Sequence, residues 1–270
     1  IRIFKLLDNQ EIIVNNDKLK IENNISGKLE FKNLWFAYNK KDYVLRNINF
    51  KINPGNVLAI VGSTGSGKTS IINLINRFYE FNKGEIYLDE NKLRDYNLNE
   101  LRQVIGYVPQ DVFLFSDTIR NNLTLGNKKI SDSEIWDVIR YLKAERFIEK
   151  LPGKLDYNVM ERGATLSVGQ RQLLSCIRIL LFDPKIILLD EATSSVDSET
   201  EEIIQNAISK ILNKRTSIVV AHRLSTIKQA DNIIVLENGE IVESGKHNDL
   251  KKNNKHYSKL YKMQFSKIAT

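Results

Sequence analysis

Apolar runs of strand length alternate with helix-like patterns along most of the chain, beginning at about residue 28. Short apolar runs predict strands at residues 29–36, 57–61, 85–88, 185–189, 217–220 and 233–236. Helical spacing of apolar residues predicts helices at 68–77, 168–181 and 199–212. Strands and helices that alternate in this order predict an α/β core with a mainly parallel sheet.

Two stretches of the folded region, 28–270, depart from this alternation. Residues 29–51 are strand-rich without helices, which predicts an N-terminal antiparallel β layer. Residues 98–161 are dominated by helical patterns, with helices expected at 132–141 and 144–150, so a helical subdomain is expected over about 98–180. Residues 1–27 are polar after an apolar opening, which predicts a short helix and a linker that ends near Gly27.

The composition is that of an ordinary globular protein, with 42% apolar and 27% charged residues. Forty basic against 33 acidic residues give a formal charge of +7, which could suit nucleic acid. The basic residues are scattered, however, and the lysines of the tail 246–267 have the spacing of a solvated helix face, so no nucleic-acid partner is expected. The single cysteine, Cys176, excludes an internal disulfide and favours a reducing, cytoplasmic setting.

Nothing in the sequence predicts a spanning helix, because no stretch approaches the roughly eighteen apolar residues that one needs. No signal-peptide pattern opens the chain either. The first residue is Ile1 rather than Met, so we expect a segment of a longer protein.

One motif predicts phosphate binding. It fits G-x-x-x-x-G-K-[ST] between a strand-like run and a helical stretch, and it consists of Gly62, Ser63, Thr64, Gly65, Ser66, Gly67, Lys68 and Thr69, followed by Ser70. Its glycines let backbone N–H groups curl around phosphate oxygens, and the following helix directs its positive end at them. Lys68 is expected to reach the β- and γ-phosphates, and Thr69 to offer a hydroxyl to Mg²⁺.

A second apolar strand ends in two adjacent carboxylates, Asp190 and Glu191. Alternation along a strand directs them to different sides. We therefore expect Asp190 to serve Mg²⁺, directly or through water, and Glu191 to polarise the attacking water as general base. Such a strand end is common on its own, and it is the phosphate loop that favours the functional interpretation.

The sequence Leu166-Ser167-Val168-Gly169-Gln170, directly before a helix, resembles the signature of ABC ATPases, which is usually Leu-Ser-Gly-Gly-Gln. Alone, the same residues are typical of a helix N-cap followed by a glycine turn. The resemblance implies the ABC ATPase fold: a P-loop NTPase core with a parallel sheet, an antiparallel β layer and an inserted helical subdomain. It also implies that Ser167, Val168, Gly169 and Gln170 face the γ-phosphate of a partner domain across a dimer.

The rest of the family's residues follow in order over residues 28–266. The resemblance implies that Tyr38 stacks on adenine, that Gln110 contacts Mg²⁺ or the water, and that His222 contacts the γ-phosphate and orients Glu191. Ser195 and Asp197 resemble the loop that crosses the dimer interface. An aromatic residue in a strand is more often core, and a lone histidine at a strand end is more often structural, but the ordered series favours the functional roles.

Two shorter motifs resemble those of the exporters whose membrane domains are fused to the ATPase. The opening residues 1–8 resemble the segment that leaves the last transmembrane helix, and Glu161-Arg162-Gly163 resembles an exporter motif that senses the membrane domain. The resemblance to multidrug and lipid half-exporters implies an ATPase on the cytoplasmic face of a bacterial inner membrane. There it would convert ATP and water to ADP and phosphate and power export through ATP-driven dimerisation.

Val168 departs from the family pattern, because it replaces the first glycine of the signature. A β-branched residue lacks the backbone freedom of glycine. The same change is familiar in bacterial half-exporters that form heterodimers, so a partner of different sequence is one interpretation. A homodimer that tolerates valine is the other.

Two further functions are compatible with the motifs. A soluble ABC ATPase acting on nucleic acid or ribosomes would fit the basic charge, but the stretch between Lys68 and Asp190 is too short for a long coiled-coil insertion and no second cassette follows. A regulatory cassette that does not hydrolyse ATP is disfavoured because Glu191 and His222 are both present.

Overall fold

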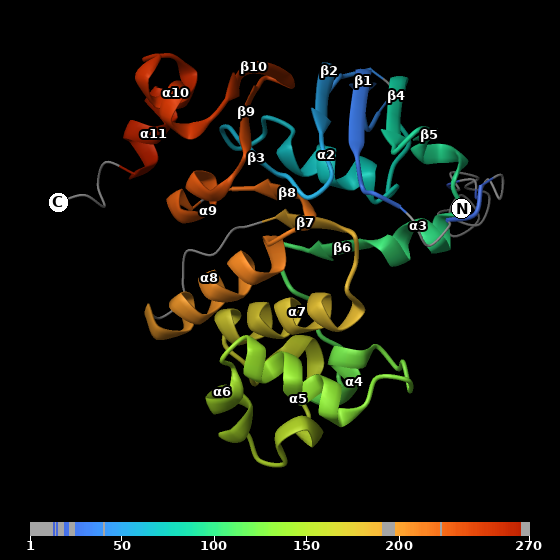
Figure 1. Ribbon diagram of the computed structural model, residues 1–270, viewed down its shortest axis with the longest axis vertical. Coiled ribbons are helices and arrows are strands. Elements are labelled where there is room, and N and C mark those ends of the chain that lie inside the picture. The colour runs from blue at the N-terminus through green and yellow to red at the C-terminus, as the bar shows by residue number, and fades with distance from the viewer. Residues whose placement is uncertain are drawn as a thin grey trace, which may run out of the picture.

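The computed structural model describes residues 13, 15, 19–21, 25–39, 41–190, 198–221 and 223–265. Two sheets form the centre of the described molecule (Figure 1). The four-stranded sheet has the order β2-β1-β4-β5 and consists of β1 (Leu29–Phe36), β2 (Leu45–Ile52), β4 (Lys83–Leu88) and β5 (Asn91–Lys92). The six-stranded sheet has the order β10-β9-β3-β8-β7-β6 and consists of β3 (Val57–Val61), β6 (Ile105–Val108), β7 (Ile186–Asp190), β8 (Thr216–Val220), β9 (Asn232–Glu237) and β10 (Glu240–Gly245).

The six-stranded sheet is parallel except for β10, which pairs antiparallel to β9. Its central strands are buried on both faces, as all-parallel strands generally are. In β3, Leu58 and Ile60 face one apolar core, whereas Val57, Ala59 and Val61 face the other. A continuous apolar run thus supplies two cores at once, because successive side chains alternate between faces.

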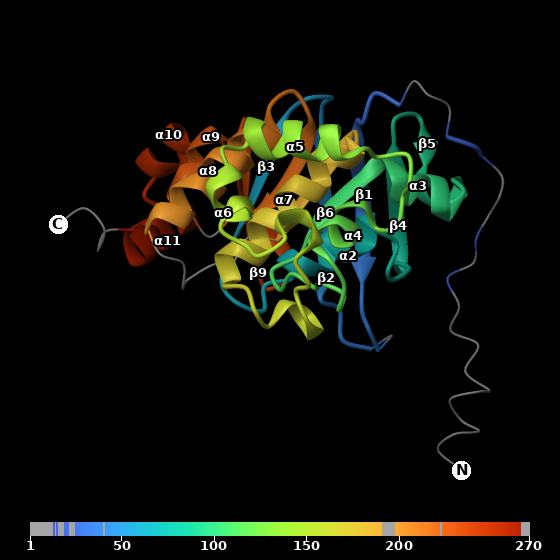
Figure 2. The ribbon, with the colours of Figure 1, turned by 90° about the horizontal axis from the view of Figure 1, so that it is seen from below.

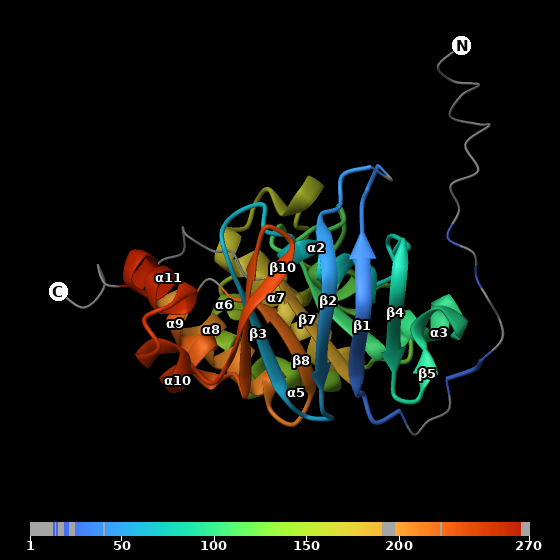
Figure 3. The same ribbon diagram turned by 90° about the horizontal axis from the view of Figure 1, so that it is seen from above.

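Helix α2 (Lys68–Ile75) lies between the two sheets. Its apolar residues Ile71, Ile72, Leu74 and Ile75 share a core with β1, β2 and β4 on one side and with β3, β7, β8 and β9 on the other. Figure 3 shows the strands of the four-stranded sheet side by side above this core. Both sheets therefore fix the position of the helix that follows the phosphate loop.

Helices cover the opposite face of the six-stranded sheet (Figure 2). They are α4 (Ile119–Thr124), α5 (Asp132–Tyr141), α6 (Glu145–Glu149), α7 (Val168–Phe182) and α8 (Ser198–Leu212). The remaining described α-helices are α3 (Leu98–Val104), α9 (Leu224–Gln229), α10 (His247–Lys252) and α11 (His256–Phe265). Cys176 is buried on α7 within this second core, as its small apolar character predicts. None of the helices in the described ranges has the length and apolar character needed to cross a bilayer.

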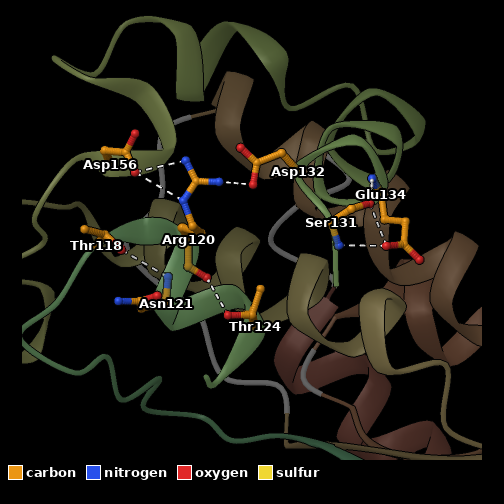
Figure 4. A network of polar contacts seen from close by, with 8 residues as sticks. All are labelled: Thr118, Arg120, Asn121, Thr124, Ser131, Asp132, Glu134 and Asp156. Carbon is orange, nitrogen blue, oxygen red and sulfur yellow. Dashed lines mark hydrogen bonds and ion pairs between the residues drawn. The ribbon is translucent and has the colours of Figure 1, made fainter. Parts of the chain in front are cut away.

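Polar contacts join the short helices of the lower layer (Figure 4). Arg120 on α4 pairs with Asp156 at 2.9 Å and with Asp132 at the start of α5. Ser131 caps α5: its hydroxyl accepts from the Glu134 backbone N–H, while the Glu134 carboxylate accepts from the Ser131 N–H at 2.7 Å. Such a reciprocal cap satisfies N–H groups that a helix start would otherwise leave without partners. The α4–α5 pair is therefore held by surface polar contacts as well as by its core.

The sequence predicted the α/β class, the antiparallel layer and the main helices correctly, within one or two residues at most element ends. It did not predict β6, because residues 98–161 were expected to be helix-dominated. β6 has only four residues, and it pairs with β7 as an edge of the main sheet. Gly106 permits this close approach, since a Cβ there would lie 2.5 Å from Pro184 Cγ. β10 was also missed because it is polar and only half-buried.

The segment expected to be a linker contacts the domain at several of its described residues. Leu19 donates its N–H to Asp95 O and accepts from Asn97 N–H, both at 3.0 Å. The Ile21 N–H donates to Glu100 Oε2 at 2.6 Å. The short helix expected in residues 1–8 lies outside the described residues. Ordered contacts thus extend upstream of Gly27, where we expected the folded domain to begin.

Asp89 binds the segment that leads into β1. Its carboxylate accepts from the backbone N–H groups of Ser26, Gly27 and Lys28 at 2.9, 3.0 and 2.8 Å, and from the Ser26 hydroxyl. Its own N–H donates to Lys28 O at 2.8 Å. One carboxylate therefore fixes three consecutive residues.

Replacing Asp89 with Ala should lower the free energy of unfolding by about 1–3 kcal/mol, because partly buried N–H groups lose their acceptor. Urea denaturation of the 270-residue chain measures this change. Asp137→Ala is the matched control, because the exposed ion pair that Asp137 forms with Arg140 should contribute no more than about 0.5 kcal/mol. Equal losses in the two variants would contradict the role assigned to Asp89.

Candidate functional site

The phosphate loop connects β3 to α2 as the sequence predicts. Gly65 and Gly67 adopt positive φ angles of 80° and 103°, a region that favours glycine. A Cβ at Gly67 would lie 2.7 Å from Leu45 Cδ2, so the loop also needs glycine there for space. The Ser66 N–H donates to Ser63 O at 3.2 Å, which closes a turn. The loop therefore has the backbone of a concave anion-binding turn that runs into a helix N-terminus.

Lys68 is 7% exposed and holds the loop from within. Its Nζ donates to the carbonyl oxygens of Gly62 and Ser63 at 2.9 and 2.8 Å. Burial lowers the pKa of Lys68, and the negative charge of Asp190 partly offsets this effect. An ammonium group has three N–H donors, so one remains for a ligand oxygen.

A cavity of about 410 Å³ opens over the loop. It brings together nine residues that the sequence singled out: Tyr38, Thr64, Gly65, Gly67, Lys68, Thr69, Ser70, Gln110 and Asp190. Val44 and Val220 also line it. Sequence reasoning missed both valines because a single apolar side chain in a loop or at a strand end forms no motif. The cavity joins residues from five separate parts of the chain.

The other loop residues support the cavity without lining it. Gly62 and Ser63 present the carbonyl groups that bind Lys68. A Cβ on Gly62 would lie 2.1 Å from Leu236 O on β9, so only glycine fits there. Ser66 is buried, and its Oγ has no hydrogen-bond partner among the described residues. An unsatisfied buried hydroxyl of this kind usually marks a functional or strained position.

Three residues with oxygen-bearing side chains line the cavity: Asp190, Thr69 and Gln110. Oxygen donors of this kind are what a hard divalent cation takes. Asp190 is 5% exposed, and burial, helped by the Asp190 charge, raises the pKa of neighbouring Tyr107 to about 12. No cluster of three His, Cys, Asp or Glu residues able to hold a metal exists in the described part of the chain. One carboxylate and one hydroxyl suit Mg²⁺, because this ion usually retains several water ligands and is also coordinated by oxygen atoms of the substrate phosphates.

The signature residues lie elsewhere, because none of the residues 167–170 lines this cavity. Ser167 is the N-cap of α7: its hydroxyl accepts from the Gln170 N–H at 3.2 Å, and Gln170 Oε1 accepts from the Ser167 N–H at 2.9 Å. Its hydroxyl proton stays available as a donor. The structural role of Ser167 is thus observed, and it leaves a donor for a second one.

Val168 is the first residue of α7 and is not among the residues with positive φ. Its backbone therefore does not use the freedom of glycine in this conformation, contrary to our reason for singling it out. Val168 differs from glycine in the volume of its side chain, which is 43% exposed at the N-terminus of α7. Gly169, the next residue, is buried.

Four of the expected site residues lie outside the described residues: Glu191, Ser195, Asp197 and His222. The residues that flank the segment 191–197, and those that flank His222, are described. Asp190 ends β7, and Val220 and Ala221 lead out of β8, which pairs with β7. Both Asp190 and Val220 line the cavity. The chain therefore leaves the edge of the cavity at the points where Glu191 and His222 follow.

Residues 45–194, more than half of the chain, match the family model described as ABC transporter. The chain belongs to the ABC transporter family. It is the ATP-binding ATPase domain of that family, which agrees with a phosphate loop, a buried aspartate and a capped signature helix in one fold. The fold class predicted from the sequence is confirmed.

Known relatives support the exporter resemblance. A probable multidrug resistance ABC transporter ATP-binding/permease protein of Bacillus subtilis is 42% identical over 97% of this chain, which covers 39% of that protein. The ATP-dependent lipid A-core flippase of Escherichia coli K12 is 43% identical over 97% of this chain, which covers 45% of it. A solved bacterial Atm1-family ABC exporter with ATP bound superposes with a TM-score of 0.89 at 34% identity, over 98% of this chain and 47% of that one. The chain thus spans less than half the length of these relatives.

Replacing Lys68 with Met should weaken ATP binding by about 10- to 100-fold, since a charge-assisted hydrogen bond to a phosphate oxygen is lost. Isothermal titration calorimetry with ATP measures the change. Lys128→Met, at an exposed position outside the cavity, should leave the affinity unchanged. If both variants bind ATP as tightly as the parent chain, Lys68 does not contact the phosphates.

Proposed function

We propose that this ABC domain hydrolyses MgATP within a dimer and powers the export of a substrate by a bacterial half-transporter. The observation that carries the proposal is the cavity, where the phosphate loop, Gln110 and Asp190 meet beside the aromatic ring of Tyr38. The multidrug and lipid flippase names of the relatives support transport out of the cytoplasm, but cargo would be chosen outside this chain.

Each cavity residue has a role that its position supports. Backbone N–H groups of the loop and the N-terminus of α2 bind the phosphates. Lys68 directs its remaining N–H to the β- and γ-phosphate oxygens, where negative charge develops during transfer. Tyr38 offers its half-exposed ring to the adenine base, and Ser70 lies beside it. Glu191 and His222 lie outside the described residues, and for them we propose the roles that the family resemblance implies: Glu191 orients and deprotonates the attacking water, and His222 contacts the γ-phosphate.

Thr69, Gln110 and Asp190 would hold Mg²⁺, which would supply positive charge to neutralise the phosphates. The chain's own contribution is to hold these donors in place. Asp190 is fixed at the end of a buried strand, and Thr69 at the start of a helix packed between two sheets. Gln110 follows β6, an edge strand of the six-stranded sheet.

A second copy or a related chain completes the site. Ser167, Gly169 and Gln170 lie at the N-terminus of the fifteen-residue helix α7 but not in the cavity of their own chain. We propose that they bind the γ-phosphate held by the partner domain, and that Ser195 and Asp197 lie at the interface. The free proton of the Ser167 hydroxyl supports this role, because a donor at a helix N-terminus favours an anion.

The transmembrane part of the same full-length chain is the other partner we propose, which places this domain on the cytoplasmic face of the membrane. Exposed aromatic residues support a docking surface after Gln110: Phe113 and Phe115 are each more than half exposed and pack edge to face. Gly163 of the Glu161-Arg162-Gly163 motif lies against Leu114 between them. We propose that residues 1–27 connect to the membrane part, and that about 98–180 form the helical subdomain that carries this surface.

Changing Glu191 to Gln should reduce ATP hydrolysis by about 10²- to 10⁴-fold if Glu191 is the general base. ATP binding should persist, and dimers should accumulate because phosphate is not released. Phosphate release and multi-angle light scattering measure the two effects. Glu202→Gln, at an exposed position on α8, is the matched control. Unchanged turnover in Glu191→Gln would overturn the assignment.

A heterodimer is the composition we propose, because the exposed side chain of Val168 adds bulk where the partner's phosphate would approach. In the Glu191→Gln background, Val168→Gly should then raise the fraction of ATP-dependent homodimers several-fold. Val168→Ala controls for the lower helix propensity of glycine, since it removes bulk at little cost to the helix. Stable homodimers with Val168 in place would show instead that the chain tolerates valine in a homodimer.

A further inference from the structure

Three aromatic rings form a cluster beside the nucleotide cavity, and only one of them lines it. The ring of Tyr38 packs perpendicular to the ring of Phe36, with centroids 4.6 Å apart and planes at 74°. It packs perpendicular to the ring of Tyr79 as well, at 4.8 Å and 89°. The rings of Phe36 and Tyr79 lie 6.0 Å apart. Edge-to-face contacts of this kind fix ring orientation in addition to burying area.

Helix α2 holds the hydroxyl end of the same ring. The Tyr38 hydroxyl and Ser70 Oγ are 3.0 Å apart, and Asn73 Nδ2 donates to the Tyr38 hydroxyl at 3.4 Å. Ser70 lines the cavity directly after Thr69. The ring is thus held at its hydroxyl end by Ser70 and Asn73 of α2 and along its side by two other rings.

Tyr79 is the part of this arrangement that has no other evident use. It follows the C-terminal end of α2, is 45% exposed, and lies outside the cavity lining. Its hydroxyl makes no hydrogen bond to the described residues, whereas its ring contacts both Phe36 and Tyr38. The contact with Tyr38 is therefore what the ring of Tyr79 contributes to the site.

We infer that Tyr79 is a positioning residue, which fixes the ring of Tyr38 for stacking on the base of the nucleotide. The inference rests on the role proposed above for Tyr38. Because Ser70, Asn73 and Tyr79 all belong to α2 or to the segment that leaves it, the same helix sets the phosphate-binding loop and the base platform. Preference for a nucleotide over a polyphosphate without a base then depends on a residue that contacts neither ligand.

The test compares ATP with inorganic tripolyphosphate, which lacks the base, on variants of the 270-residue chain. Tyr79→Leu keeps an apolar side chain but removes the ring, and it should weaken ATP binding by about 2- to 10-fold, the range of a lost aromatic pair. Tripolyphosphate affinity should stay unchanged, which also shows that the variant is folded around its phosphate loop. Tyr79→Phe should restore ATP affinity, because the ring and not the hydroxyl makes the contact.

A double-mutant cycle separates positioning from direct contact. If Tyr79 acts through Tyr38, Tyr38→Ala combined with Tyr79→Leu should bind ATP no more weakly than Tyr38→Ala alone. The matched control is Phe78→Leu: Phe78 is the preceding residue, is 43% exposed, and packs on Tyr107 rather than on Tyr38. This control should change neither affinity.

Four outcomes would overturn the inference. Additive losses in the double variant would show that Tyr79 acts independently of Tyr38, and equal weakening of ATP and tripolyphosphate would show a general effect on the loop. Unchanged ATP affinity in Tyr79→Leu, with a clear loss in Tyr38→Ala, would overturn the role of Tyr79 alone. If Tyr38→Ala also binds ATP normally while Lys68→Met does not, the stacking role proposed for Tyr38 is wrong, whereas the phosphate-binding role of Lys68 is supported.

Discussion

The packing of α2 between two sheets is the constraint on which the rest of the domain depends. A helix buried on one side needs one apolar stripe, but α2 carries apolar residues toward both sheets and keeps its polar N-terminus at the cavity. Its first residue, Lys68, is buried against the loop that it stabilises. The phosphate loop is therefore fixed at both ends. It begins at β3 and ends at α2, and α2 cannot move without disrupting its packing against both sheets.

The sequence predicted those parts of the fold that repeat a period or complete a motif. β3, α2 and the loop between them combine a continuous apolar run with fixed glycines, and their positions were correct. β10 was missed because it is polar and half-exposed, although its partner β9 directly precedes it. β6 was missed because a four-residue edge strand obtains its structure from β7, which is distant in the sequence. The same reason applies to Val44, Val220 and Tyr79, which gain their place at the site only through tertiary packing.

The case of Ser167 shows a different limit. The interpretation as an ordinary N-cap and the interpretation as a signature residue looked like alternatives in the sequence, yet the structure makes the first compatible with the second. A hydroxyl can accept from its own helix and donate outward at the same time. A motif that also satisfies a local structural rule is therefore not weakened by that rule. Val168 shows the opposite case: a departure from a motif that was expected to cost conformational freedom does not, because the backbone at this position has no positive φ angle.

The contacts upstream of Gly27 have a mechanical consequence. Leu19 and Ile21 bind the residues around Asp95 and Glu100, and the latter belongs to α3, which runs without a break into β6 and on to Gln110. A displacement of residues 19–21 would therefore be transmitted to α3, and through α3 and β6 to the segment that carries Gln110. The phosphate loop, by contrast, is joined to inner strand β3.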